Sequence, residues 1–163
     1  PLQPRGFLRE TAGYGALQEG DTERALEWLS EAERLVPDSP RVNLIRAFVL
    51  ERMQSYARAR LEVGRALELT APKGFAQALE TQATIALHQR DYAGAIEAYS
   101  RLADDFENGV ALFRRAQLQW QLKRPARARA DLERVRDAFP QIWKQLEANA
   151  KVKAWCAQVL QAK

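Results

Sequence analysis

Few residues of this chain could act together as a chemical centre. His88 is the only histidine and Cys156 the only cysteine, so a nucleophile–base pair would have to unite these two distant positions. The neighbouring carboxylates Asp104 and Asp105 are expected in water at the end of a helix. No His, Cys and carboxylate residues cluster with the spacing of metal ligands, and Gly13-Tyr-Gly15 is too short for a phosphate-binding loop. We therefore predict no enzyme activity, no metal site and no cofactor.

The composition is typical of a folded chain that can bury a hydrophobic core. The sequence has 163 residues, is 47% hydrophobic and carries a net charge of +4, which fits one domain and argues against disorder. No run of about 18 apolar residues predicts a membrane-spanning helix. A single cysteine excludes an internal disulfide. The bias toward arginine and alanine suggests a bacterial source with GC-rich coding, whereas the cellular compartment stays unknown.

The dominant pattern is a repeat of about 34 residues that occurs four times. Its clearest markers are Ala25, Ala59, Ala95 and Ala128, which lie 34, 36 and 33 residues apart. A second set of small residues precedes each marker by 12 positions, and this set consists of Gly13, Ala47, Ala83 and Ala116. Small residues let two helices approach closely, and a fixed period of this size indicates stacked helical hairpins.

Each repeat predicts two amphipathic helices joined by a short turn. The expected helices span 5–19, 22–36, 40–53, 55–70, 74–89, 92–105, 109–122 and 125–138. Turn residues at 37–40, 71–74 and 107–109 separate the hairpins. No segment alternates apolar and polar residues over a length sufficient for a strand. The repeats are expected at about 6–39, 40–75, 76–108 and 109–140, within a domain of residues 1–140. Residues 141–163, as one helix or two short ones, are expected to cap the last apolar face.

The second half of each repeat resembles the tetratricopeptide repeat family, most clearly in Arg90-Asp-Tyr-Ala-Gly-Ala-Ile-Glu-Ala-Tyr99. Gly20-Asp21 and Asp91-Tyr92 stand where the family often has its turn. The first halves depart from the family pattern. Its Trp position holds Arg9, Asn43, Leu79 and Leu112, and the Leu of its Leu-Gly pair is Ala12, Arg46, Gln82 and Arg115. The resemblance covers about residues 6–140.

The resemblance implies an all-α fold, a right-handed superhelical stack of about four helix-turn-helix repeats with a C-terminal capping helix. The first helix of each repeat would line a concave groove that binds a peptide or partner protein. Carried over position by position, the partner-binding residues would be Tyr14, Arg41, Leu44, Phe48, Arg52, Phe113, Arg114, Gln117 and Trp120. The aromatic and leucine side chains would anchor the partner and the arginines would pair with its acidic groups. An equally open alternative is that Phe48 and Phe113 only pack neighbouring repeats.

Two features restrict the choice of partner. Glu10 and Tyr14 occupy positions where certain co-chaperones of the family carry a Lys/Asn clamp for a terminal carboxylate, and Glu10 would repel that group. The fourth repeat is rich in basic residues, which raises the alternative of a nucleic-acid-binding helical repeat with Trp120 stacking on bases. Acidic residues interrupt this basic segment, so nucleic acid is not the expected partner. A homo-oligomer formed through residues 1–20 is a third option.

Overall fold

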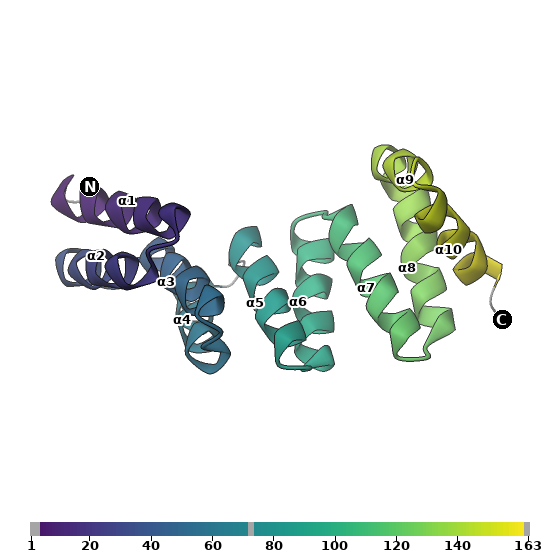
Figure 1. Cartoon of the computed structure of the whole chain (residues 1–163). Helices are drawn as coiled ribbons and strands as arrows, with labels where there is room; N and C mark the ends of the chain where they lie inside the picture. The colour runs from purple at the N-terminus through teal and green to yellow at the C-terminus, as the bar shows by residue number, and fades with distance from the viewer. Residues whose placement is uncertain (1–3, 72–73, 162–163) are drawn as a thin grey trace. The chain divides into compact units, whose positions relative to one another are not determined.

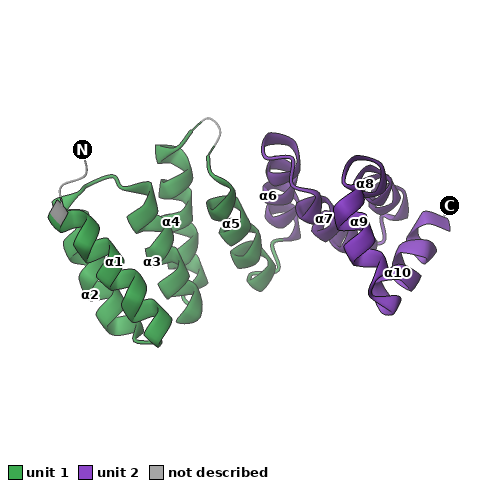
Figure 2. Ribbon diagram, turned by 90° about the horizontal axis from the view of Figure 1, so that it is seen from above, with its two compact units in different colours: residues 1–91 green, residues 92–163 purple. Residues whose placement is uncertain are grey.

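The structure is a computed structural model that describes residues 4–71 and 74–161. Within these ranges the chain forms helices and no strand, so the prediction of an all-α fold is confirmed. The outermost residues of the predicted repeat domain and of the C-terminal segment lie outside the described ranges, as do residues 72 and 73 of one predicted turn. The chain divides into two compact units, residues 1–91 and 92–163 (Figure 2).

Helices of the first unit follow the expected hairpins closely (Figure 1). They are α1 (Pro4–Glu19), α2 (Thr22–Leu35), α3 (Pro40–Arg52), α4 (Tyr56–Leu69) and α5 (Ala76–His88). Helix α1 packs against α2 and α3 against α4, and the two hairpins meet through α2 and α3. Helix α5 packs against α4.

The second unit contains five further helices. They are α6 (Tyr92–Asp105), α7 (Gly109–Gln121), α8 (Pro125–Ala138), α9 (Pro140–Glu147) and α10 (Ala150–Gln161). Helix α7 packs against both α6 and α8, and α9 and α10 both pack against α8. The segment after Pro140 thus forms two helices, the second of the two alternatives that the sequence allows.

Local sequence explains where these helices begin. The side chain of Asp21 accepts a hydrogen bond from the Arg24 amide at 3.0 Å, and Asn108 accepts one from the Ala111 amide at 3.0 Å. Such N-caps satisfy donors that the first turn leaves without a partner. Pro125 stands in the first turn of α8, where the missing amide proton costs nothing.

The two sets of small residues lie where the helices are tightly packed. Every alanine of both sets is completely buried, and Gly13 is buried as well. A Cβ atom added to Gly13 would lie 2.7 Å from Cγ of Leu29, on the facing helix α2. A side chain at position 13 would therefore push α1 away from α2, which is why this mid-helix glycine is tolerated.

The turns inside the hairpins share one backbone feature. Gly20, Gln54, Arg90 and Lys123 each have a positive φ, between 58° and 85°. Each of these residues stands two positions before the second helix of its hairpin. Only the first is a glycine, so the other three turns hold an ordinary residue in the left-handed region that glycine adopts at less cost.

Two largely buried arginines, with side chains 18% and 16% exposed, stand where the chain departs from the family pattern. Arg115 of α7 forms a bidentate pair with Asp131 of α8, through Nε at 2.9 Å and Nη2 at 2.6 Å. Its Nη1 donates to Ser100 Oγ of α6 at 2.7 Å. The pair is 16% and 10% exposed in its two side chains, and the hydrogen bond that Arg115 donates to Asp131 raises the pKa of Arg115 above its usual value.

Arg46 repeats this arrangement in the first unit. Its guanidinium pairs with Glu33 of α2 and, at 3.2 Å, with Glu62 of α4. In each unit the buried arginine of a first helix thus meets an acid 16 residues later, in the second helix of the same hairpin. A leucine at these positions would contribute apolar packing, whereas the arginines join three helices through polar contacts.

Candidate functional site

The first unit contains a pocket of about 570 Å³ that helices α1, α3 and α5 line together. Its lining residues are Tyr14, Pro40, Arg41, Leu44, Ile45, Phe48, Thr70, Phe75 and Gln77. Four residues that the sequence nominated for partner binding, Tyr14, Arg41, Leu44 and Phe48, therefore line one hollow of the surface. Their role in binding stays a prediction.

Aromatic side chains give this pocket its accessible apolar surface. Tyr14 is 43% exposed, and Phe48 is half-buried and packs against the core of the first two hairpins. Leu44 is only 2% exposed, so it belongs to the base of the pocket. A ligand would meet Tyr14 and the outer edge of Phe48 first, with the phenol hydroxyl free to face water.

Charge in the pocket depends on a pair between α3 and α1. Nε of Arg41 lies 2.5 Å from Oε1 of Glu10, whose side chain is 6% exposed, whereas that of Arg41 is 67% exposed. The distance is short, but Oε1 accepts no hydrogen bond of acceptable geometry. Burial raises the pKa of Glu10, against the lowering effect of Arg41. Arg41 therefore has a buried carboxylate as its neighbour, while its own side chain stays accessible at the rim of the pocket.

Arg52 has a different environment from the one the sequence suggested. Its Nη1 donates to the backbone oxygen of Leu17 at 2.7 Å, near the C-terminal end of α1. The same carbonyl also accepts a hydrogen bond from the Gly20 amide at 3.1 Å, so Arg52 is a second donor to it. Part of the donor capacity of Arg52 is thus engaged within the protein.

The nominated residues of the second unit all lie on α7 but differ in accessibility. Arg114 is exposed, and Gln117 and Trp120 are half-buried. Phe113 is 8% exposed and meets Trp155 of α10 edge-on, with ring centroids 5.6 Å apart. The C-terminal helix therefore covers most of the Phe113 ring, a contact that no local sequence pattern indicated.

Acids neutralise much of the basic surface in the fourth repeat. Arg115, Arg129, Arg134 and Arg136 pair with Asp131, Glu133, Asp104 and Asp137, respectively. The hydrogen bond from Arg136 lowers the pKa of Asp137. These internal pairs reduce the positive charge that a phosphate backbone would meet.

The histidine and the cysteine that could take part in chemistry belong to different units of the chain. His88 stacks on Tyr56 with ring centroids 4.7 Å apart, and its Nε2 lies 3.6 Å from Glu51. Cys156 is buried within the core of the second unit, and burial raises the pKa of its thiol. Among the described residues, no group of three or more His, Cys, Asp or Glu side chains is placed to hold a metal ion. In the same part of the chain, every helix is too short or too polar to cross a membrane.

Fold and pocket together define a class, the helical-repeat proteins whose hairpins place the first helices along a shared surface. A sequence profile of the Tetratricopeptide repeat family matches residues 11–75 and 80–141. The chain belongs to this family, whose members generally mediate protein–protein interactions and act as scaffolds rather than enzymes. No curated protein sequence matches the chain.

Solved structures of the same fold include bacterial and eukaryotic proteins. A tetratricopeptide repeat protein from Parabacteroides merdae is similar with a TM-score of 0.75 at 20% identity, over 98% of this chain and 60% of that one. PilF of Pseudomonas aeruginosa gives 0.72 at 23% identity, over 96% and 68%. The first repeat domain of Spaghetti (RPAP3), bound to the HSP90 peptide SRMEEVD, gives 0.66 at 16% identity, over 73% and 96%.

Proposed function

We propose that this protein is an interaction module that holds a peptide or a helix of a partner protein in the pocket lined by α1, α3 and α5. The observation that carries the proposal is the meeting of Tyr14, Arg41 and Phe48 in one hollow of about 570 Å³. Exposed aromatic rings beside an accessible arginine are typical of the anchors that dominate binding energy in protein interfaces.

Chemistry of the pocket favours a partner with one apolar side chain and a nearby acidic group. The apolar side chain would pack between Tyr14 and Phe48, and the acid would pair with Arg41. Gln77, exposed on α5, would add an amide that both donates and accepts hydrogen bonds. Arg52 would contribute less than the sequence suggested, because it already donates to Leu17.

In the second unit, Arg114, Gln117 and Trp120 stay candidates for further contacts with the partner, outside this pocket. Phe113 would contribute indirectly, because its ring packs on Trp155 and little of it is accessible. Replacing Phe113 would thus damage the core of the unit, and a test of binding should leave it intact.

Nucleic acid is the weaker alternative. Four of the basic residues in the fourth repeat are already paired with acids. A phosphate backbone would have to break these pairs or use the remaining cations, such as the exposed Arg124 just before α8 and the exposed Arg127 on it. The apolar pocket of the first unit has no role in that alternative.

Site-specific photo-crosslinking tests the proposal directly. A benzophenone amino acid at position 14 replaces one aromatic side chain by another in the pocket. The matched control carries it at position 61, because Leu61 of α4 is 70% exposed and outside the pocket. In a lysate of the source organism, we expect a discrete protein adduct from position 14 and none from position 61.

The adduct should disappear when Arg41→Gln and Gln77→Ala are added to the position-14 protein, with the fold checked by circular dichroism. Equal adducts from positions 14 and 61, or an adduct that survives both substitutions, would refute the assignment of the pocket. An adduct that a nuclease removes would favour the nucleic-acid alternative.

A further inference from the structure

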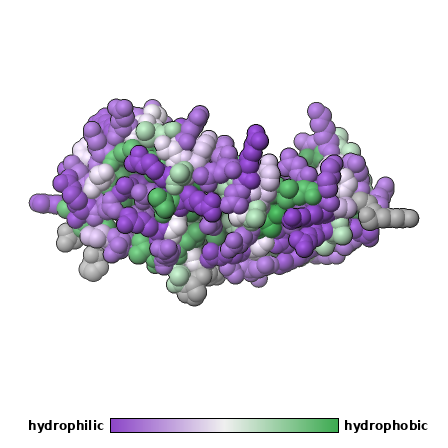
Figure 3. All heavy atoms as spheres, turned by 90° about the horizontal axis from the view of Figure 1, so that it is seen from below, coloured by the Kyte–Doolittle hydropathy of each residue, from purple (hydrophilic) through white to green (hydrophobic). Residues whose placement is uncertain are grey.

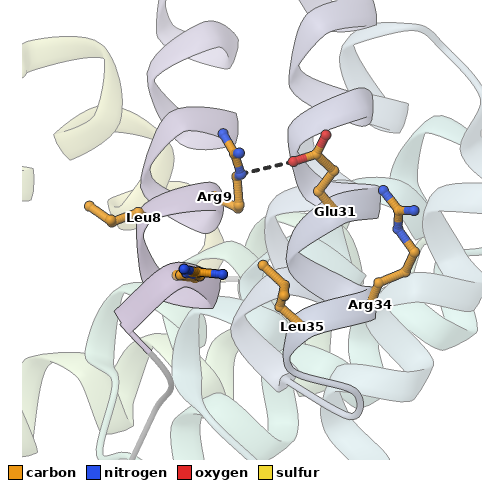
Figure 4. Close-up of a pocket in the computed structure, with 6 residues that line it drawn as sticks. Leu8, Arg9, Glu31, Arg34 and Leu35 are labelled. Atoms are coloured by element: carbon orange, nitrogen blue, oxygen red, sulfur yellow. Dashed lines mark ion pairs between the residues drawn. The ribbon is translucent and has the colours of Figure 1, made fainter.

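A second pocket of about 570 Å³ lies between α1 and α2, separate from the first by its lining residues (Figure 4). Leu8 and Leu35 supply its apolar surface, and Arg5, Arg9, Arg34 and Glu31 supply its charge. Leu8 is 64% exposed, an unusual exposure for a leucine that helps to line a hollow. The first pocket shares none of these residues, so the proposed function above does not account for this one.

Contacts inside this pocket hold one arginine and leave two available. Nε of Arg9 lies 2.8 Å from Oε2 of Glu31, and its guanidinium stacks over the Trp28 ring at 4.4 Å. Figure 4 shows this ion pair bridging the two helices, with Leu35 extending toward α1. Arg5 and Arg34 are exposed and have no ion pair among the described residues. The pocket thus combines an apolar surface with a local excess of two positive charges.

We propose that this pocket binds an acidic amphipathic helix of a partner protein. One or two apolar side chains of that helix pack on Leu8 and Leu35, and its flanking carboxylates pair with Arg5 and Arg34. Spacing of three or four residues places such groups on one helical face. The pair between Arg9 and Glu31 joins α1 to α2 beside this surface.

Charge distinguishes this partner from a membrane or a nucleic acid. Residues 1–39 contain four basic and eight acidic side chains, a net charge of −4. An extended anionic surface would meet this whole hairpin and be repelled by it. A short acidic helix meets the pocket alone, whose lining holds three arginines and one glutamate. In Figure 3, hydrophilic atoms cover most of the visible face and hydrophobic atoms show in smaller patches.

Fluorescence anisotropy with designed peptides provides the test. The probe is a labelled helical peptide with Leu on one face and Glu on both flanks, and its partner probe has Lys in place of every Glu. We expect saturable binding of the acidic probe alone, weakened by salt because the contacts are exposed ion pairs. Arg5→Glu with Arg34→Glu should reduce affinity by about tenfold or more, since both attractive contacts become repulsive. Leu8→Ser should weaken it as well.

Two controls separate this pocket from the rest of the surface. Arg58→Glu with Leu61→Ser alters another exposed leucine and arginine, on α4, and should leave the affinity unchanged. Binding that persists in the Arg5→Glu/Arg34→Glu variant and is lost with Tyr14→Ala would place the probe in the first pocket and overturn the inference. Because the Tyr14 crosslinking experiment does not involve Arg5 or Arg34, the two proposals can fail independently.

Other outcomes would also overturn the inference. Equal binding of the acidic and lysine probes, or equal affinity for the Arg5→Glu/Arg34→Glu variant, would show that the arginines do not select the ligand. Sedimentation of the free protein as a dimer that Leu8→Ser dissociates would make this surface a contact between copies of the chain. Co-sedimentation with anionic vesicles that the acidic probe does not inhibit would instead indicate a lipid surface.

Discussion

Substitution of Asp131 by Ala should destabilise the second unit strongly, because it removes the counter-charge of a buried arginine. Arg115 donates two hydrogen bonds to Asp131, and the two side chains are only 16% and 10% exposed. After the substitution, the guanidinium keeps its hydrogen bond to Ser100 but has lost the bidentate acceptor.

The cost can be estimated from the general behaviour of buried ion pairs. Breaking a buried pair by removing one partner costs about 3–5 kcal/mol. Because both side chains retain some contact with water, we expect about 2–4 kcal/mol here, or a decrease of roughly 6–12 °C in the melting temperature of a chain of this size. Replacing both residues with apolar ones, Arg115→Met and Asp131→Leu, should cost about 1 kcal/mol or less, because no uncompensated charge is buried.

Urea unfolding followed by circular dichroism measures the free energy of unfolding of both variants relative to the original protein. Asp137→Ala is the matched control, since Asp137 pairs with Arg136 on the exposed surface of the same helix, and it should leave the midpoint nearly unchanged. If Asp131→Ala shifts the midpoint no more than Asp137→Ala does, the Arg115 pair does not stabilise the unit and the reasoning is refuted.

Three further predictions concern single residues. Glu10 has a raised pKa in the folded state, so its ionisation destabilises the fold as pH rises through that value. Glu10→Gln should therefore be the more stable protein at neutral pH in thermal melts, with a difference that shrinks as pH falls. A pH-independent difference would contradict this. Burial raises the pKa of Cys156, so its thiol should react slowly with iodoacetamide in the native protein and quickly in urea, whereas fast native labelling would show that the second unit opens readily. Lys123 has a φ of 58°, so Lys123→Gly should raise stability by up to about 1 kcal/mol in urea unfolding, whereas Lys123→Val should lower it. If the turn were not strained, the valine variant would be the more stable of the two.

Most of the helical architecture could be predicted because it rests on local patterns. Small residues with a fixed period, together with turn residues between them, placed the first eight helices to within about two residues at each end. Gly13 was correctly interpreted as a close approach, since its neighbour Leu29 leaves no room for a Cβ atom. Such features depend on residues near one another in sequence, which a periodic pattern records.

Tertiary contacts of polar residues were harder to predict. Arg46 and Arg115 looked like departures from a family pattern, and their partners Glu62 and Asp131 became evident only with the structure. The separation of 16 residues, common to both pairs, could have revealed these partners, because residues 16 apart lie on the facing sides of the two helices of a hairpin. The packing of Trp155 on Phe113 leaves no such periodic trace, since the C-terminal helices stand outside the repeat.

The two buried arginines also constrain how this array can change in evolution. Helical-repeat proteins gain and lose whole hairpins by duplication and deletion, because each hairpin contacts only its neighbours. Here Arg46 joins α3 to α2 and α4, and Arg115 joins α7 to α6 and α8. Deletion of an adjoining hairpin would leave a buried guanidinium without one of its partners, at a cost that apolar junctions do not carry. Viable changes in repeat number are therefore expected at junctions without such an arginine, and recombinant arrays that retain both clusters should express as soluble protein more often than arrays that divide them.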